Sequence, residues 1–352
     1  MGINIQGNLS RGKLLDEKGQ LIESGWSTKL IKEYSRNDIA ASKWRIKEWD
    51  YYIITNGKIA IALTFAENSY MSLASVSFLD FLKPSYKTTS EIKLFTFGKN
   101  IMPSTTDNGD INYKSKRVDM IFKNDGQTRN LYCRFDKFDN INGKDINLEV
   151  NLILTDFPKD SMVIASAWNE DNKSFYYNSK INCMKASGYC IIDGKKYDFD
   201  ESDSLGTLDW GRGVWTRVNT WYWGSMQTYL DDGRKFGFNI GYGFSDRPNG
   251  SENMIFLDGI AHKFDQVTFN IPQLNGKDDF MSPWTFTSND GKFEMTFKPI
   301  IDRIDNTNLG IIASKQHQVF GLFSGQATLS DGTVINIKDK LGFAEKVYNK
   351  WW

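Results

Sequence analysis

The sequence predicts an all-β fold, and three observations support this prediction. Runs of β-branched and aromatic residues recur along the chain, beginning at residues 51–55 and 59–65. The Asn56-Gly57 pair joins these first two runs, and such a pair between two strands is typical of a tight hairpin turn. Asp-Gly pairs separate many of the later runs, and helical periodicity is rare. Many short strands joined by frequent turns indicate a β-sandwich or a β-barrel.

The strand pattern continues to the end of the chain. Further strands are predicted at residues 90–97, 117–122, 147–154, 188–192, 221–230, 235–242, 266–271, 292–299, 318–329 and 333–337. Only residues 71–82 and 341–350 are predicted as short helices. Within the second of these, Glu345 would reach inward or, as we expect, lie on the polar face.

The chain of 352 residues is long enough for two hydrophobic cores. No long linker or low-complexity segment interrupts it, so two domains would pack closely together. One series of strands ends near residues 175–178 and another begins at Gly188, and both halves combine aromatic strands with Asp-Gly turns. We therefore predict two similar antiparallel β-barrel domains, at residues 1–185 and 186–352.

Charge and composition exclude several classes of protein. The 43 Lys and Arg residues balance 43 Asp and Glu residues, so the chain lacks the positive excess that nucleic-acid binding requires. No segment approaches the roughly 18 apolar residues of a membrane-spanning helix, so we expect no integral membrane segment. Aromatic residues make up 14% of the chain and include 11 Trp, and these large flat side chains line either a core or a ligand cavity.

The cysteines, histidines and glycines argue against a metal or a phosphate-bearing cofactor. Cys183 and Cys190 are too far apart for a CxxC motif, and the chain has only 2 His. No GxxxxGK[ST] loop is present, and the glycines of residues 237–243 lie in a predicted strand without the helix that a dinucleotide needs. The N-terminus lacks the apolar region of a secretory signal. We therefore expect a cytoplasmic protein with reduced cysteines and no cofactor, and the oligomeric state stays open.

Trp residues are most concentrated between residues 208 and 224. Strand alternation points Trp221 and Trp223 to the same side. Together with Trp215 they would form a stacking wall for an apolar or planar ligand, or else the packed floor of a barrel. The two interpretations are about equally supported by the sequence.

Asp209 and Arg212 flank glycines in the same segment, and glycine allows the sharp bend that would bring the two side chains together. An Asp in an apolar aromatic pocket has a raised pKa and can act as a general acid. Arg212 would then orient it. In the structural alternative, which we favour slightly, the two residues form a buried ion pair that fixes a loop.

Five further residues complete the set of candidates. His262 and Glu252 are candidates for a second acid or base, although a structural histidine and a solvated loop are the simpler interpretations. Trp49, Asp50 and Tyr52 combine a carboxylate with aromatic rings and are candidates for ligand binding, or they simply form the edge of a strand.

These residues resemble the DUF2804 family of uncharacterised proteins, most specifically in the Asp-Trp-Gly-Arg-Gly element at residues 209–213. Supporting matches cover nearly the whole chain, at residues 25–27, 47–52, 177–180, 221–224, 252–253, 259–263, 318–321, 324–325 and 344–345. The family itself implies little about chemistry, since its function is unknown.

The second half more distantly resembles the carotenoid hydratase and AttH-like group of lipocalin-related proteins. In that group a Trp-x-Asp-His-Glu-Trp-like segment precedes a Trp-x-Trp strand and an Asp-Gly turn. This sequence has the same order, with Asp209 in the first segment, Trp-x-Trp at residues 221–223 and Asp-Gly at residues 232–233. The resemblance implies two lipocalin-like (calycin) domains with a ligand site in or between them. It also implies chemistry on apolar polyenes or related metabolites. Trp210 and Gly211 stand where the group has His and Glu, so one acid/base partner does not carry over.

We therefore expect a cofactor-free enzyme, of a hydratase, lyase or isomerase class, that acts on a mostly apolar small molecule in an aromatic cavity. Two alternatives stay open. The first is a non-catalytic protein that binds a lipid or a pigment. The second is a carbohydrate-active protein that uses Asp209 and Glu252 as a carboxylate pair.

Overall fold

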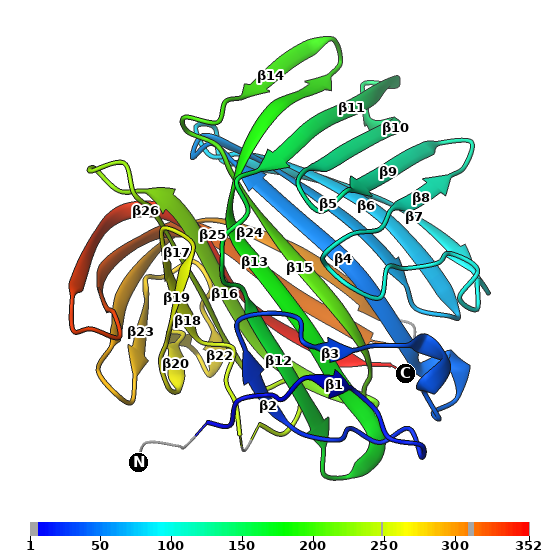
Figure 1. Cartoon of the computed structure of the whole chain (residues 1–352). Helices are drawn as coiled ribbons and strands as arrows, with labels where there is room; N and C mark the ends of the chain where they lie inside the picture. Colours follow the sequence, from blue (N-terminus) through cyan, green and yellow to red (C-terminus); the bar gives the residue numbers. More distant parts are fainter. Residues whose placement is uncertain (1–5, 248, 309–312, 352) are drawn as a thin grey trace.

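The computed structural model describes residues 6–247, 249–308 and 313–351, and it confirms the all-β prediction. Two large curled antiparallel sheets dominate the described part of the chain, with 13 and 9 strands (Figure 1). Two short 3₁₀ turns, Arg36–Asp38 and Lys43–Arg45, are the only helical elements within these residues. Within the part of the chain that the structure describes, no helix is long and apolar enough to cross a membrane.

The first sheet is built from residues of the N-terminal two thirds of the chain. Its main path runs in the order β7 (Ser85–Leu94), β6 (Met71–Asp80), β5 (Ile59–Glu67), β4 (Ile46–Thr55), β15 (Leu205–Val214), β13 (Asp171–Ile192), β11 (Lys144–Thr155), β10 (Arg129–Ile141), β9 (Val118–Asn124) and β8 (Ile111–Lys114). Three shorter strands join it from the side, namely β12 (Met162–Trp168), β14 (Lys195–Phe199) and β2 (Gly25–Ser27). A separate parallel pair consists of β1 (Gly12–Lys13) and β3 (Lys32–Glu33).

The second sheet follows the same antiparallel scheme. Its order is β19 (Ile260–Lys263), β18 (Met254–Leu257), β17 (Lys235–Tyr242), β16 (Val218–Tyr229), β26 (Val334–Lys350), β25 (Ala313–Thr328), β24 (Phe293–Asn308), β23 (Trp284–Ser288) and β20 (Val267–Asn270). A small hairpin of β21 (Gln273–Leu274) and β22 (Lys277–Asp278) lies between β20 and β23 in the chain.

Both predicted helices are wrong. Residues 71–80 form strand β6, and residues 341–350 are the end of strand β26. The physical reason is visible in the burial of β26. Phe343, Ala344, Glu345 and Val347 are all buried, because β26 is covered on both faces at residues 342–345 and the alternation of its two ends is interrupted there.

The change from one sheet to the other occurs between Val214 and Val218, later than the predicted boundary at residue 185. Residue 185 lies inside β13, where the register with β15 shifts between Ile181 and Met184 and Cys183 has a φ of 63°. The break in the sequence pattern is therefore a β-bulge that bends one long strand.

Each curled sheet encloses its own apolar core, and further apolar clusters join the two sheets. Tyr51 and Ile53 of the first sheet pack with Trp223, Phe320 and Phe343 of the second. A neighbouring cluster combines residues of β12 and β13 with residues of β18. The outer faces of β4, β13 and β15 are thus buried against the second sheet, and the candidate site lies between the two sheets.

Candidate functional site

Asp209 and Arg212 lie on opposite faces of β15, so the predicted pairing between them is wrong. Residues three positions apart on a strand point in opposite directions. Arg212 points into the first core, where its Nη2 lies 3.0 Å from Asp50 Oδ1 and donates to the Pro103 carbonyl at 2.8 Å. Asp209 points to the second sheet.

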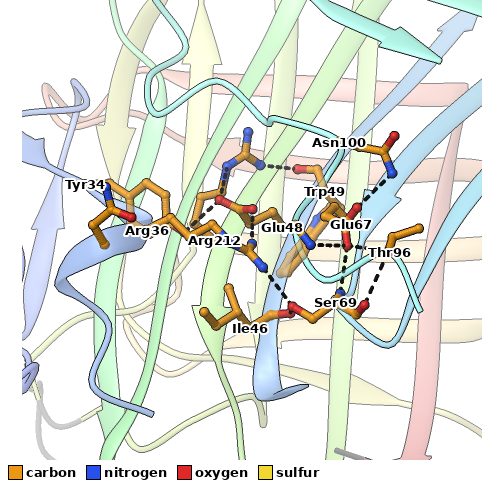
Figure 2. Close-up of polar contacts among 12 residues, drawn as sticks. Tyr34, Arg36, Ile46, Glu48, Trp49, Glu67, Ser69, Thr96, Asn100 and Arg212 are labelled. Atoms are coloured by element: carbon orange, nitrogen blue, oxygen red, sulfur yellow. Dashed lines mark hydrogen bonds and ion pairs between the residues drawn. The ribbon is translucent and has the colours of Figure 1, made fainter. Parts of the chain in front are cut away.

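Arg212 belongs to the network of charged side chains in Figure 2. Glu48 accepts a hydrogen bond from the Tyr34 hydroxyl at 2.7 Å and pairs with Arg36. Glu67 accepts hydrogen bonds from Thr96 at 2.6 Å and Asn100 at 2.8 Å. These contacts, together with the bond from Arg212 to Pro103, hold the 95–106 segment against the first sheet.

Asp50 and Tyr52, which the sequence suggested as ligand-binding residues, also point into the first core. Asp50 is 5% exposed, and burial raises its pKa while the charge of Arg212 opposes that rise. Tyr52 is 2% exposed and its hydroxyl accepts a hydrogen bond from Arg129 at 3.2 Å. Both residues therefore contact structural partners rather than the space between the sheets.

Three donors surround the Asp209 carboxylate. Lys180 Nζ lies 2.8 Å from Oδ1, Asn178 Nδ2 donates to the same oxygen at 2.6 Å, and Trp49 Nε1 donates to Oδ2 at 3.2 Å. Asn178 and Lys180 are two positions apart on β13 and therefore share the face that meets the second sheet. The arrangement fixes the position of a carboxylate that is only 7% exposed.

Gly211 explains why the Asp-Trp-Gly sequence matters to this site. A Cβ atom added at Gly211 would lie 2.0 Å from a ring carbon of Trp49. The absence of a side chain thus gives the Trp49 indole room to lie across β15 and direct its Nε1 toward Asp209. The glycine serves close packing and not the sharp bend expected from the sequence.

Trp221 and Trp223 point to the same side of β16, as strand alternation predicts. Trp223 Nε1 donates to Asn239 Oδ1 at 2.7 Å, and Lys180 Nζ lies 3.9 Å from the centroid of the Trp223 ring. Trp221 Nε1 donates to Glu345 Oε1 at 3.0 Å. Lys180, the partner of Asp209, thus lies over the Trp223 ring, while Trp221 binds a second carboxyl group.

Glu345 is that second carboxyl group, and it lies buried on strand β26 instead of on the polar face of a helix, where the sequence pattern had placed it. It is 4% exposed, and its Oε2 accepts hydrogen bonds from Gln318 Nε2 at 3.1 Å and Gln316 Nε2 at 3.3 Å. Burial raises the pKa of Glu345, and the negative charge of Asp209 adds to this rise. The hydrogen bond from Trp221 and the more distant charges of Arg303 and Lys180 oppose it.

The two carboxyl groups therefore have different electrostatic environments. Asp209 is in direct contact with a lysine, whereas Glu345 accepts hydrogen bonds from neutral amides and an indole. The raised pKa of Glu345 suits a proton donor, and two carboxyls in unlike surroundings are the usual arrangement of an acid and a base in one site. Tyr51 lies nearby with a pKa raised to about 12 by burial, and its hydroxyl faces Gln318 without a well-formed hydrogen bond to any described residue.

The other predicted residues lie elsewhere or contribute to packing. Glu252 pairs with Arg247 at 2.8 Å, and its backbone carbonyl accepts a hydrogen bond from Asn239 at 2.8 Å. His262 lies on the edge strand β19, where Nδ1 accepts a hydrogen bond from the Ser330 amide at 3.2 Å and burial lowers its pKa. Trp215 packs against Trp49 with ring centroids 5.6 Å apart.

Lys47 occupies an aromatic box two positions before Trp49. Its Nζ lies 4.6 Å from the centroid of Tyr70, 5.7 Å from Trp215 and 5.8 Å from Trp351. The side chain is fully buried, and the Trp44 carbonyl accepts its hydrogen bond at 3.2 Å. Burial, together with the charges of Arg45 and Arg36, lowers the pKa of Lys47 to about 7.

Replacing this lysine by Met should change how stability depends on pH. The pKa of Lys47 is about 7 in the folded state, well below the roughly 10.4 of an unfolded lysine. The free-energy cost of burying the ammonium charge is therefore fully present below pH 7 and disappears as the pH rises toward about 10.4. The free energy of unfolding of the wild type should consequently rise by a few kcal/mol between about pH 7 and pH 10.4. We expect Lys47→Met to flatten this rise in urea unfolding measured from pH 6 to pH 10. Lys43→Met, at an exposed lysine, is the control, and parallel curves for all three proteins would contradict the prediction.

Comparison with known proteins agrees with the fold and assigns the family. The model of the DUF2804 family, a domain of unknown function, matches residues 6–351. The chain belongs to the DUF2804 family. No protein of curated function matches the sequence significantly.

Two solved structures are similar to this chain at low sequence identity. A protein designated AttH from Nitrosomonas europaea is 15% identical, with a TM-score of 0.52 over 91% of this chain and 97% of its own. Kievitone hydratase from Nectria haematococca is 10% identical, with a TM-score of 0.45 over 92% of this chain and 97% of its own. The first of these supports the all-β, two-sheet architecture of this DUF2804 protein.

Proposed function

We propose that this DUF2804 protein is a cofactor-free enzyme that acts on a mostly apolar small molecule by acid–base chemistry between its two sheets. The observation that carries the proposal is the pair of buried carboxyls, Asp209 beside Lys180 and Glu345 among neutral donors. The indoles of Trp49, Trp221 and Trp223 contact these carboxyls or Lys180, and such an aromatic surrounding favours an apolar substrate.

In a hydration, Glu345 would donate a proton to one carbon of a substrate double bond. Water would add to the other carbon, and Asp209 would take the proton that this water loses. A later proton transfer from Asp209 to Glu345 restores the starting state, so the sum is addition of one water. The Trp221 ring would stabilise positive charge that develops on the substrate, because aromatic faces attract cations. An isomerisation would use the same donor and acceptor without water.

The carbohydrate alternative gains no support from these contacts. A glycosidase requires two carboxyls that face a sugar in an open cleft. Glu252 is paired with Arg247 and is 3% exposed, whereas Asp209 contacts Lys180. Non-catalytic binding of an apolar ligand is an outcome that the following experiment separates from catalysis.

The proposal is tested by incubating the protein with a panel of apolar alkenes and conjugated polyenes in water enriched in ¹⁸O. Mass spectrometry would detect a hydration product as an added water bearing the label, and an isomer as a product of unchanged mass with a new retention time. Tight binding of a panel member that is recovered unaltered would favour the binding alternative.

On a substrate found in this way, Glu345→Gln should lower kcat by about 10²–10⁴-fold, the usual contribution of a general acid. The amide keeps the shape of the carboxyl group but has no acidic proton to donate. The control is Glu252→Gln, the same substitution at a buried glutamate outside the Asp209–Glu345 pair. A Glu345→Gln variant with unchanged kcat would remove Glu345 from the mechanism.

A further inference from the structure

A crevice enters the space between the two sheets near the β4–β5 hairpin. Its outer part has a volume of about 310 Å³ and is lined by residues that include Asn56, Asp203, Tyr229 and Lys340. This outer part is called the mouth below. The mouth carries charged and polar groups and is open to solvent.

A narrow inner space continues from the mouth and is called the neck. It shares Thr55, Gln227 and Leu341 with the mouth, so the two spaces lie next to each other. The neck holds about 20 Å³, which is room for little more than one water molecule. Its walls are mostly apolar and include Ala60 and Phe81.

The two carboxyls lie beyond the inner end of the neck and do not line it. Thr207, two positions from Asp209 on β15, and Phe343, two positions from Glu345 on β26, do line it. Residues two positions apart on a strand lie on the same face at a distance of about 7 Å. The same spacing relates three further neck residues to residues near the carboxyls, in the pairs Ile53 and Tyr51, Ser225 and Trp223, and Phe320 and Gln318.

We infer that the mouth and the neck form the entry route and binding groove for an elongated substrate with one polar end. This inference rests on the function proposed above. The polar end stays among the charged groups of the mouth, the apolar chain lies along the neck, and the opposite end reaches Asp209 and Glu345. A compact polar molecule would gain nothing from the apolar walls.

The neck must widen before such a molecule can pass, and the contacts that close it are identifiable. Thr207 Oγ1 donates to Gln227 Oε1 at 2.8 Å, and Gln227 Nε2 donates to the Leu205 carbonyl at 3.0 Å. These bonds join β15 of the first sheet to β16 of the second. Gln227 is therefore a positioning residue that holds the neck closed when no ligand is bound.

Cysteine accessibility tests this route without knowledge of the substrate. Ser225→Cys places a thiol in the neck, and Ser179→Cys places one at an equally buried position that faces the first core. Each variant is treated with methyl methanethiosulfonate, and modification of each cysteine is followed by peptide mass spectrometry. We expect the thiol at 225 to react about tenfold faster or more, because local opening of the neck exposes it while the core stays closed. The three native cysteines, all buried, give the background rate.

Equal rates at positions 225 and 179 would overturn the route. Ala60→Cys in the neck and Ala74→Cys in the first core form a second matched pair if the serine variants fold poorly. In a second experiment, the neck cysteine of the reactive variant is modified with hexyl methanethiosulfonate, so that the hexyl group fills the neck. Turnover should then fall at least tenfold, and unchanged turnover would also overturn the route. A reactive neck thiol in a protein without turnover would contradict the proposed function but not the route, so the two failures are distinguishable.

Discussion

Asp209→Asn should abolish most of the activity in a variant that still folds, with lower stability because buried Lys180 loses its carboxylate partner. Asparagine has the same shape and can still accept the hydrogen bond from Trp49, but it carries no charge and cannot take a proton. We expect kcat to fall by about 10²–10⁴-fold on any substrate that the wild-type protein converts. The measurement is steady-state turnover, with circular dichroism and urea unfolding to show that the variant is folded.

The matched control for this variant is Asp50→Asn. Asp50 is also a buried aspartate in contact with a cation, and it lies on β4, directly beside β15. Its side chain points into the first core, so the same substitution should lower stability but leave turnover largely unchanged. Equal turnover in Asp209→Asn and the wild type would exclude Asp209 as the base, and equal loss in both variants would show that the effect is structural.

Arg212→Ala should have the largest effect on stability. Arg212 is fully buried, and its guanidinium contacts Asp50 and the carbonyls of Trp49, Gly211 and Pro103. Removing it leaves a buried carboxylate without its cation and several carbonyls without their donor. Breaking a buried pair in this way costs about 3–5 kcal/mol. The expected result is a large decrease in the free energy of unfolding in urea.

Two further variants make this result specific. Arg234→Ala removes an arginine that pairs with Asp232 on the exposed turn before β17, and it should change stability by no more than about 0.5 kcal/mol. Adding Asp50→Asn to Arg212→Ala should recover part of the loss, because the uncompensated charge is then absent. A loss for Arg212→Ala as small as that for Arg234→Ala would contradict the structural role.

Sequence patterns predicted the class of the fold and part of the site. Strand periodicity and Asn-Gly or Asp-Gly turns are local properties, so the all-β architecture followed from them. The same-side orientation of Trp221 and Trp223 followed from alternation within one strand. The concentration of specific residues around Asp209 directed attention to this segment, whose role in function stays a prediction. The spacing of two between Asn178 and Lys180 indicates that both lie on one face of a strand, and this was a usable signal for the partners of Asp209.

The sequence did not indicate which residues of other strands pair with a given charged side chain. Asp209 and Arg212 are neighbours in the chain, but the pleat of β15 separates them and each finds its ion-pair partner on another strand. The place of Glu345 was not predicted because residues 342–345 of β26 are buried on both faces, which removes the alternation that identifies a strand. Local periodicity indicated most of the strands and the face that a side chain takes within a strand, but it assigned residues 71–82 and 341–350 to helices. Only the packing of one sheet against the other placed Asp209 and Glu345, from distant segments, near enough for the charge of Asp209 to raise the pKa of Glu345, because that placement depends on long-range register and burial.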